Sequence, residues 1–341
     1  MRILNIDSQY FVSQFRDWGH QVLTIGQGAG HDLELTTSLD LKGLFEFLEA
    51  RNFWPDLIVW NDRCRPPAVH GLERLPGVNI GFSIDQYCNP WHVPYSAVFD
   101  LFLVSQKDSL RTFDLDHVPR PCRWFPLFCE PRRDSDPGLE RDIPVSFVGT
   151  LKPPMNPDRW VFLEAFREQH PLRVHEGEYG SIFSRSRIVL NQSAAGELNF
   201  RIFQAAAHGA AVLTEGVENG LADLFCPGED ILTFPRGDAG AAAQTAREAL
   251  AEAESLEELA RAGQRKVLNE HSVAVRAKQI LAWAERLARE KAQQWRLEHQ
   301  SLVRRELAKA FYMLAADLNL PLSGEMRRGF LEVGAGYEKV E

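Results

Sequence analysis

The sequence contains few cysteines, and they do not form a recognisable framework. Among 341 residues there are only five, an odd number, at spacings that fit neither a set of metal ligands nor a small disulfide-stapled domain. We therefore expect reduced thiols, as in a cytoplasmic protein. The cysteines are Cys64, Cys88, Cys122, Cys129 and Cys226.

Long apolar runs are also absent. No stretch approaches the roughly 20 apolar residues that a membrane-spanning helix needs. The chain starts on a short strand-like run, residues 2–6, without the apolar core and small-residue cleavage site of a signal peptide. We therefore expect no signal peptide, no membrane span and a cytoplasmic location.

An excess of positive charge is missing as well. The formal net charge is −9, so the chain lacks the basic footprint of a nucleic-acid-binding protein. The ten histidines show no metal-ligand spacing. The acidic pair in Asp114-Leu115-Asp116 is too short a motif to indicate a metal site. We expect no metal ion and no nucleic-acid partner, and a binding partner that is a small molecule or a polypeptide.

What is present is an alternation of short apolar runs with amphipathic stretches, which is typical of a doubly wound parallel sheet. The length favours two domains. We predict an α/β fold with a first Rossmann-like domain over residues 1–130, a charged, proline-rich linker over 131–144 and a second Rossmann-like domain over 145–271. Helices follow over 272–341. The expected strands are residues 3–6, 21–25, 57–60, 79–82 and 101–105, then 145–148, 172–175, 188–191, 210–214 and 230–234.

The most informative segment covers residues 190–215. It predicts a buried strand ending at Asn191, a polar loop, a helix over 199–208 that Gly209 ends, and a second buried strand. Such a unit places the loop and the helix N-terminus at the carboxyl edge of a parallel sheet, where ligands and phosphate groups bind. Asn191, Asn199, Arg201 and Gln204 add polar groups to this edge, which favours a ligand with an anion and hydroxyls, such as a nucleotide sugar.

This segment resembles the nucleotide-binding helix of GT-B glycosyltransferases, and most closely the spore-maturation-protein (CgeB-like) group. The shared pattern runs through Asn199-Phe200-Arg201-Ile202-Phe203-Gln204, continues in residues 219–230 (NGLADLFCPGED) and also reaches residues 147–151 and 262–272, so that it covers about 145–285 well and the N-terminal half weakly. The resemblance implies two Rossmann-like domains facing a ligand cleft, a metal-independent glycosyltransferase without a cofactor, and a nucleotide diphospho-sugar as donor. It also implies that residues 272–289 pack back on the first domain.

The resemblance assigns the donor-site residues of the second domain. Gln204 stands where many relatives have a Glu that binds the ribose hydroxyls, and an amide oxygen can still accept those hydrogen bonds. A second family Glu falls at Gly196, so either the adjacent Glu197 serves or that contact is missing. Arg201 is expected on the diphosphate. Asn199 either contacts the donor or caps the helix.

Two further loops of the second domain are candidates for the donor phosphates. Gly149 allows close approach of the backbone, and Lys152 or Arg159 could supply a cation, although a lone loop lysine is commonly just solvated. Asn219 and Gly220 could offer backbone N–H groups, or they could form a plain turn.

The first domain is expected to bind the acceptor. Asp85 is a candidate base for the acceptor hydroxyl and His92 a candidate contact for the donor sugar or phosphate. The alternative is that this aromatic loop, with Tyr87 and Trp91, simply packs and that Asp85 caps a turn. The loop that starts at Asp7 after the first strand faces the same cleft.

Two functions remain open at this point. The first is a glycosyltransferase whose acceptor is a glycan, a small molecule or a protein. The second is a non-catalytic GT-B scaffold or sugar-nucleotide-binding protein that acts through its C-terminal helices, which could also form a homodimer.

Overall fold

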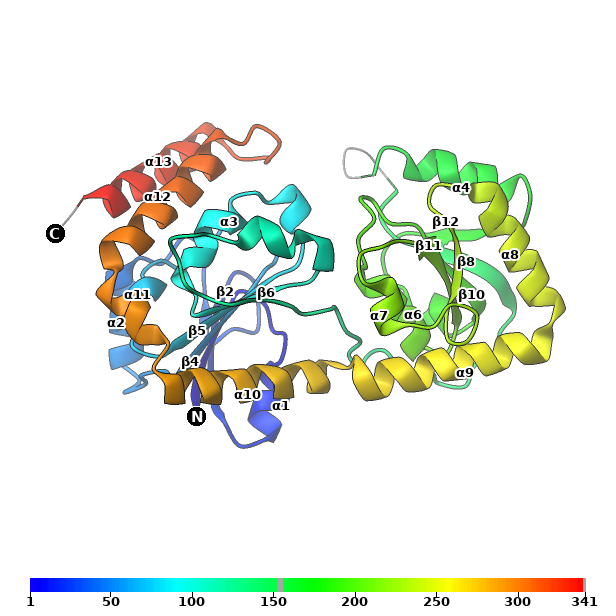
Figure 1. Cartoon of the computed structure of the whole chain (residues 1–341), viewed down its shortest axis with the longest axis horizontal. Helices are drawn as coiled ribbons and strands as arrows, with labels where there is room; N and C mark the ends of the chain where they lie inside the picture. Colours follow the sequence, from blue (N-terminus) through cyan, green and yellow to red (C-terminus); the bar gives the residue numbers. More distant parts are fainter. Residues whose placement is uncertain (152–155, 340–341) are drawn as a thin grey trace. The chain divides into compact units, whose positions relative to one another are not determined.

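The computed structural model describes residues 1–151 and 156–339 and divides the chain into two compact units (Figure 1). The first unit combines residues 1–125 with 277–341, and the second covers 126–276. Within the described residues, no helix is both long enough and apolar enough to cross a membrane.

The first unit is built on a seven-stranded parallel sheet in the order β3-β2-β1-β4-β5-β6-β7. The direction of winding reverses between β1 and β4, and this is the point at which open α/β sheets place their ligands, outside the carboxyl ends of the strands. The strands are β1 (Arg2–Ile6), β2 (Gln21–Gly26), β3 (Leu33–Glu34), β4 (Leu57–Asn61), β5 (Val78–Ser83), β6 (Leu101–Val104) and β7 (Cys122–Trp124).

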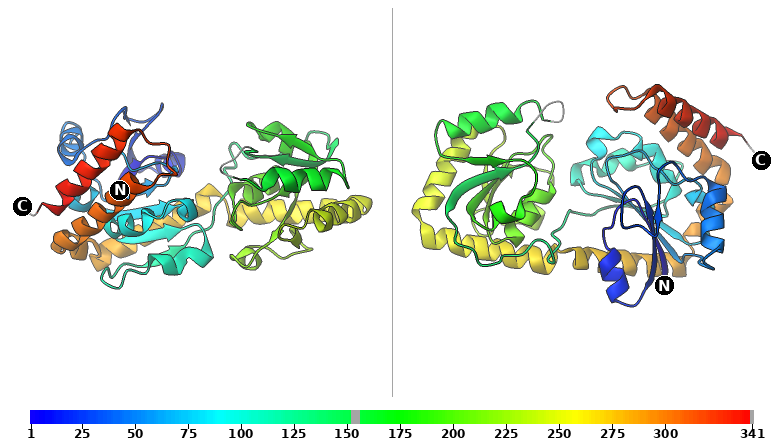
Figure 2. Two further views of the ribbon diagram at one scale, coloured as in Figure 1. Left: turned by 90° about the horizontal axis from the view of Figure 1, so that it is seen from above. Right: turned by 180° about the vertical axis from the view of Figure 1, so that it is seen from behind.

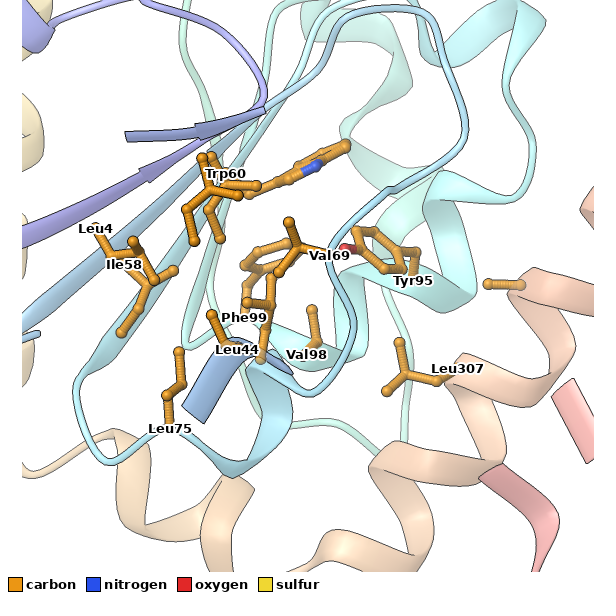
Figure 3. Packing of buried hydrophobic residues seen from close by; sticks show 14 of the residues in the cluster. Leu4, Leu44, Ile58, Trp60, Val69, Leu75, Tyr95, Val98, Phe99 and Leu307 are labelled. Carbon is orange, nitrogen blue, oxygen red and sulfur yellow. The ribbon is translucent and has the colours of Figure 1, made fainter. Parts of the chain in front are cut away.

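The core of the first unit lies between this sheet and its helices (Figure 3). Trp60 of β4 stacks on Phe99 at 5.6 Å between ring centroids, and both are 1% exposed. The helices α1 (Val12–Asp17), α2 (Leu41–Glu49) and α3 (His92–Tyr95) belong to the N-terminal part of the unit. The remaining helices come from the C-terminal end of the chain: α10 (Val273–Glu290), α11 (Gln293–Glu298), α12 (Gln300–Ala316) and α13 (Gly324–Glu338).

Helices α11 and α12 complete the first unit. Leu307 and Phe311 of α12 are buried in the same core as Trp60, and α13 packs along α12 (Figure 2). The guanidinium of Arg296 on α11 is buried, and it contacts both carboxylate oxygens of Asp100 at 3.0 and 3.2 Å. These contacts make the C-terminal helices an integral part of this unit.

The second unit holds a five-stranded parallel sheet in the order β12-β11-β10-β8-β9. Ile188 to Asn191 of β10 are all buried, as expected for a central strand covered on both faces. The strands are β8 (Ile143–Val148), β9 (Arg173–His175), β10 (Ser186–Asn191), β11 (Ala211–Gly216) and β12 (Leu232–Pro235). The helices are α4 (Arg159–Arg167), α5 (Gly180–Phe183), α6 (Phe200–Ala207), α7 (Leu221–Leu224), α8 (Ala239–Ala251) and α9 (Ala253–Glu270).

Residues 131–144, which we expected to be a linker, lie within the second unit. Asp134 is fully buried there; its Oδ2 accepts the backbone N–H of Glu130 at 2.7 Å and its Oδ1 accepts the Tyr179 hydroxyl at 2.7 Å. A polar sequence can be anchored in this way when buried partners satisfy its charges, so the composition alone was misleading here.

Candidate donor and acceptor sites

The carboxyl edge of the sheet in the second unit brings two arginines to one aromatic ring. Arg201, the second residue of α6, places its guanidinium carbon 4.4 Å from the ring centroid of Phe147 on β8. Arg159, the first residue of α4, places its own at 5.4 Å from the same centroid. Both distances are those of cation–π contacts, and the ring holds two positive charges side by side.

Arg201 is oriented by oxygens at the ends of two strands. Its Nε donates to the carbonyl of Val148 at 2.7 Å, and its Nη1 donates to Asn191 Oδ1 at 2.6 Å. The pKa of Arg201 is lowered to about 9, mainly by burial and also by the positive charge of Arg159, against an opposing effect of Glu197. A side chain with these surroundings gains from a neighbouring anion.

Arg159 is held at the same edge by the loops that follow β8 and β10. Its Nη1 donates to the Thr150 carbonyl at 2.8 Å, and its Nε donates to Gln192 Oε1 at 2.8 Å. The carbonyl of Gln192 accepts Arg159 Nη2 at 3.0 Å and Arg201 Nη1 at 3.4 Å, so one residue links the two guanidinium groups. Arg159, one of two cations considered for this loop, therefore lies beside Arg201 at the carboxyl edge of the sheet.

Gly149 makes room for Arg201. A Cβ atom built on Gly149 would overlap Arg201 Nη2 and would lie 3.2 Å from Phe147 Cζ. A glycine is therefore needed at this position because any side chain would collide with the Arg201 guanidinium. Lys152, the other predicted cation, lies outside the described residues.

The loop between β10 and α6 is ordered by two carboxylates. Glu215 at the end of β11 accepts the backbone N–H of Ser193 at 3.0 Å and that of Gly237 at 3.2 Å. Glu197 accepts the backbone N–H groups of Ala194 at 2.9 Å and Ala195 at 2.6 Å. Each oxygen of Glu197 thus accepts a backbone N–H group of its own loop, which sets the orientation of the carboxylate in this conformation.

Gly196 explains the departure from the family pattern. Its φ is +81°, in the left-handed region where a side chain is strained, and its N–H donates to Ser193 Oγ at 3.1 Å. The backbone at this position therefore favours glycine over the glutamate of the relatives.

Asn199 and Gln204 have contacts inside the unit. The side-chain oxygen of Asn199 accepts the backbone N–H of Arg201 at 3.1 Å, which is the helix-capping alternative. Gln204 donates from Nε2 to the Tyr179 hydroxyl at 3.0 Å. Within the described residues its amide oxygen receives no hydrogen bond, so it can still accept one from a ribose.

Asn219 and Gly220 lie beside the same loop. Asn219 Nδ2 donates to the Gly196 carbonyl at 3.4 Å. Gly220 has a φ of +84°, and its N–H donates to the Glu218 carbonyl at 2.7 Å. The turn alternative is therefore present, and the Gly220 N–H is not available to a phosphate in this conformation.

The carboxyl edge of the first unit is organised by Asp62, which the sequence did not single out. Its Oδ2 accepts the backbone N–H groups of Ile84 at 3.0 Å and Asp85 at 3.1 Å, and its Oδ1 accepts that of Cys64 at 2.7 Å. These bonds tie the loop after β4 to the loop after β5. Asp62 could have been identified from the sequence, because it is an acidic residue immediately after a buried strand.

The prediction that His92 contacts the donor is wrong for this conformation, because His92 is fully buried. Its Nδ1 lies 2.8 Å from Ser83 Oγ and its Nε2 lies 3.7 Å from Asp62 Oδ1. Burial lowers its pKa against the opposing charge of Asp62, so the ring is neutral near pH 7. It supports the loop rather than touching a ligand.

Asp85 lies on the loop as predicted, and it precedes the short helix of residues 86–88 without a capping hydrogen bond from its side chain. Tyr87 is 44% exposed, whereas Trp91 is 1% exposed and donates from Nε1 to Asn89 Oδ1 at 3.1 Å. Asp85 Oδ2 accepts the thiol of Cys64 at 2.5 Å. Among the described residues there is no group of three histidines, cysteines or acidic residues that could hold a metal ion.

Comparisons with known proteins agree with this architecture. Residues 126–282 match a family model described as Glycosyl transferase-like. No curated protein matches the chain. Among solved structures, the chain is similar to sucrose-phosphate synthase from Thermosynechococcus elongatus, with 15% identity and a TM-score of 0.60 over 85% of this chain and 100% of that one.

Two further structures give the same result. HepE of Anabaena, solved in complex with UDP-glucose, is 12% identical with a TM-score of 0.61 over 84% of this chain and 100% of that one. A glycosyltransferase from Rickettsia africae ESF-5 is 10% identical with a TM-score of 0.60 over 84% of this chain and 98% of that one. The fold is that of the GT-B glycosyltransferases, as predicted. With the family match on the second unit, these comparisons support a glycosyltransferase as the class of enzyme.

Proposed function

We propose that this chain transfers a sugar from a nucleotide diphospho-sugar to a hydroxyl acceptor, and that Arg159 and Arg201 bind the diphosphate without a metal ion. The observation that carries the proposal is the pair of guanidinium groups that share contacts with the Phe147 ring and the Gln192 carbonyl, at the sheet edge where α/β folds bind phosphates. Two adjacent cations favour a dianion and stabilise the charge that develops on a departing nucleoside diphosphate.

The other candidate residues fit around this centre. The free amide oxygen of Gln204 accepts a hydrogen bond from the ribose, and Gly149 keeps the Arg201 guanidinium in place. The solved complex of HepE with UDP-glucose supports the choice of a nucleotide sugar as donor, because the two chains share a fold. Several features remain predictions. They are the class of the acceptor, which includes a protein, membership of the CgeB-like subgroup, a cytoplasmic location and a homodimer through the C-terminal helices.

One observation favours a second candidate, a sugar-nucleotide-binding protein without transferase activity. Gly196 stands where the resembling family has a glutamate, at a backbone position that disfavours any side chain, and the adjacent Glu197 is engaged by backbone N–H groups of its own loop. If that glutamate is needed for transfer, this chain binds its donor and does not turn it over.

Nucleotide binding tests the proposal directly. UDP, GDP, dTDP, CMP and ADP are added to the purified protein with a chelator present, and unfolding is followed by thermal shift. At 100 times its dissociation constant, the correct nucleotide stabilises the fold by about 2.7 kcal/mol. Arg201→Ala removes charge-assisted hydrogen bonds worth about 1.5–3 kcal/mol, so affinity falls by roughly 10- to 150-fold.

Arg261→Ala is the matched control, because Arg261 is an exposed arginine of the same unit that pairs with Glu257 at 2.5 Å. It should bind the nucleotide as the wild type does. Failure of every nucleotide to bind refutes the proposal. Binding without transfer to any acceptor from a panel of sugars, glycans and peptides favours the second candidate.

A further inference from the structure

We propose that Asp7, and not Asp85, is the residue that takes the proton from the acceptor hydroxyl. The inference rests on the proposed transfer reaction and adds to it the identity of the base. It is carried by the position, backbone conformation and hydrogen bonding of Asp7 at the carboxyl edge of the first unit.

Asp7 directly follows β1, the strand at which the winding of the sheet reverses. Its backbone N–H donates to the Ile25 carbonyl of β2 at 2.8 Å, and Arg63 from the loop after β4 donates to its carbonyl at 3.2 Å. The residue is thus fixed between the two strands that flank β1, at the usual ligand position of such sheets. Its φ of +71° places an aspartate in the left-handed region, a strained conformation that is common at functional sites.

The two carboxylate oxygens of Asp7 have different surroundings. Oδ2 accepts the indole N–H of Trp60 at 2.8 Å, which sets the orientation of the group. Oδ1 receives no hydrogen bond within the described residues, and Asp7 retains 8% of its surface exposed. One oxygen is held and the other is available, which is the arrangement that a general base requires.

The neighbouring carboxylates are used differently. Both oxygens of Asp62 accept backbone N–H groups of the two loops, and Oδ2 of Asp85 accepts the Cys64 thiol. Asp62 therefore ties the two loops together, and Asp85 holds the Cys64 thiol. Asp7 has one oxygen anchored by the Trp60 indole N–H and one that receives no hydrogen bond from the described residues.

The electrostatic surroundings give this carboxyl a suitable proton affinity. The pKa of Asp7 is raised to about 7, mainly by burial and to a smaller extent by the charge of Asp62, against the hydrogen bond from Trp60 and the charge of Arg63. Two other titratable groups face it. His31 contacts its backbone carbonyl, and burial lowers the pKa of His31; Tyr95 of α3 stays neutral because burial raises its pKa. A base with a pKa near the working pH is the most effective.

In the step itself, the acceptor O–H proton moves to Asp7 Oδ1 as the acceptor oxygen bonds to the anomeric carbon. The bond from that carbon to the phosphate oxygen breaks, and the nucleoside diphosphate leaves with the electron pair. The Asp7 proton returns to solvent in the next cycle.

Asp7→Asn tests this step with little change to the structure. Asparagine accepts the left-handed backbone readily, and its amide oxygen can still accept the Trp60 indole N–H. The wild-type kcat/KM should rise with pH through about 7, because the base must be ionised. The variant should lose roughly 10²- to 10⁴-fold at pH 8 and show no such rise, while nucleotide affinity stays within twofold. Asp116→Asn, at an exposed position of the same unit, is the matched control.

The outcomes separate the two proposals. Transfer by Asp7→Asn at a rate near that of the wild type overturns the assignment of Asp7 and leaves the proposed function intact. Absence of transfer by the wild type refutes the proposed function, and this step with it. A titration of the Trp60 indole N–H resonance near pH 7 that disappears in Asp7→Asn supports the assignment.

Discussion

Gly149 allows the arrangement of the donor site to be tested without removing any of its charges. In Gly149→Ala the new Cβ would overlap Arg201 Nη2, and the two atoms must separate by roughly another 1 Å to reach van der Waals contact. The backbone of Gly149 is not left-handed, so alanine adopts the same backbone conformation without strain. The substitution therefore acts through the contact between the new Cβ and the Arg201 side chain.

The displaced guanidinium loses its present geometry. The Arg201 hydrogen bonds to the Val148 carbonyl, at 2.7 Å, and to Asn191 Oδ1, at 2.6 Å, would both lengthen beyond the usual limit. We expect the affinity for the preferred nucleoside diphosphate to fall by about 10- to 100-fold, which corresponds to about 1.4–2.8 kcal/mol. Isothermal titration calorimetry at a temperature where every variant is folded measures this change.

A double-mutant cycle with Arg201→Ala identifies the cause. If Gly149→Ala acts by displacing Arg201, it has almost no further effect once Arg201 is alanine, and the two changes are strongly non-additive. Gly216→Ala is the control, because its new Cβ would meet only the Phe234 carbonyl at an ordinary 3.5 Å. Wild-type affinity of Gly149→Ala, or full additivity in the double variant, would refute the reasoning.

Two further predictions concern stability and are measured by urea denaturation. Arg296→Met leaves the buried Asp100 carboxylate without its bidentate partner and should destabilise the first unit by about 3–5 kcal/mol. Because burial already raises the pKa of Asp100, the variant should gain stability as the pH falls and lose it as the pH rises; a loss below 1 kcal/mol would contradict the buried pair. Gly196→Ala should cost about 1–2 kcal/mol because its φ is +81°. Gly240→Ala, in helix α8 without a positive φ, should be neutral or stabilising, and equal effects of the two changes would be evidence against backbone strain.

Much of the sheet architecture followed from local pattern. The ten expected strands are all present, within a few residues of their predicted bounds, because each is a buried apolar run in an alternating α/β chain. Strands β3 and β7 were not predicted. They have two and three residues and are only partly buried, so neither hydrophobicity nor length distinguishes them from loops.

The candidate sites were predicted unevenly. Arg201 and Gly149 were recognised from the helix motif and the strand end, whereas their steric dependence on each other joins positions 52 residues apart in the sequence and is visible only in the fold. His92 was expected at a ligand, yet Ser83 and Asp62 enclose it. Asp7 was placed at the acceptor edge without a role, because its burial and the Trp60 hydrogen bond are long-range properties.

The sequence by itself determined the fold class, the positions of most strands and the identity of the nucleotide-binding helix, because these depend on periodicity and on a short motif. The tertiary structure decided which charged groups come together and which are occupied. It brought Arg159 and Arg201 to the ring of Phe147. The carboxylate oxygens of Glu197 and Asp62 accept backbone N–H groups, whereas one oxygen of Asp7 receives no hydrogen bond from the described residues. Burial and hydrogen-bond partners come from segments distant in the chain, and they decide the chemistry of a carboxylate or a guanidinium.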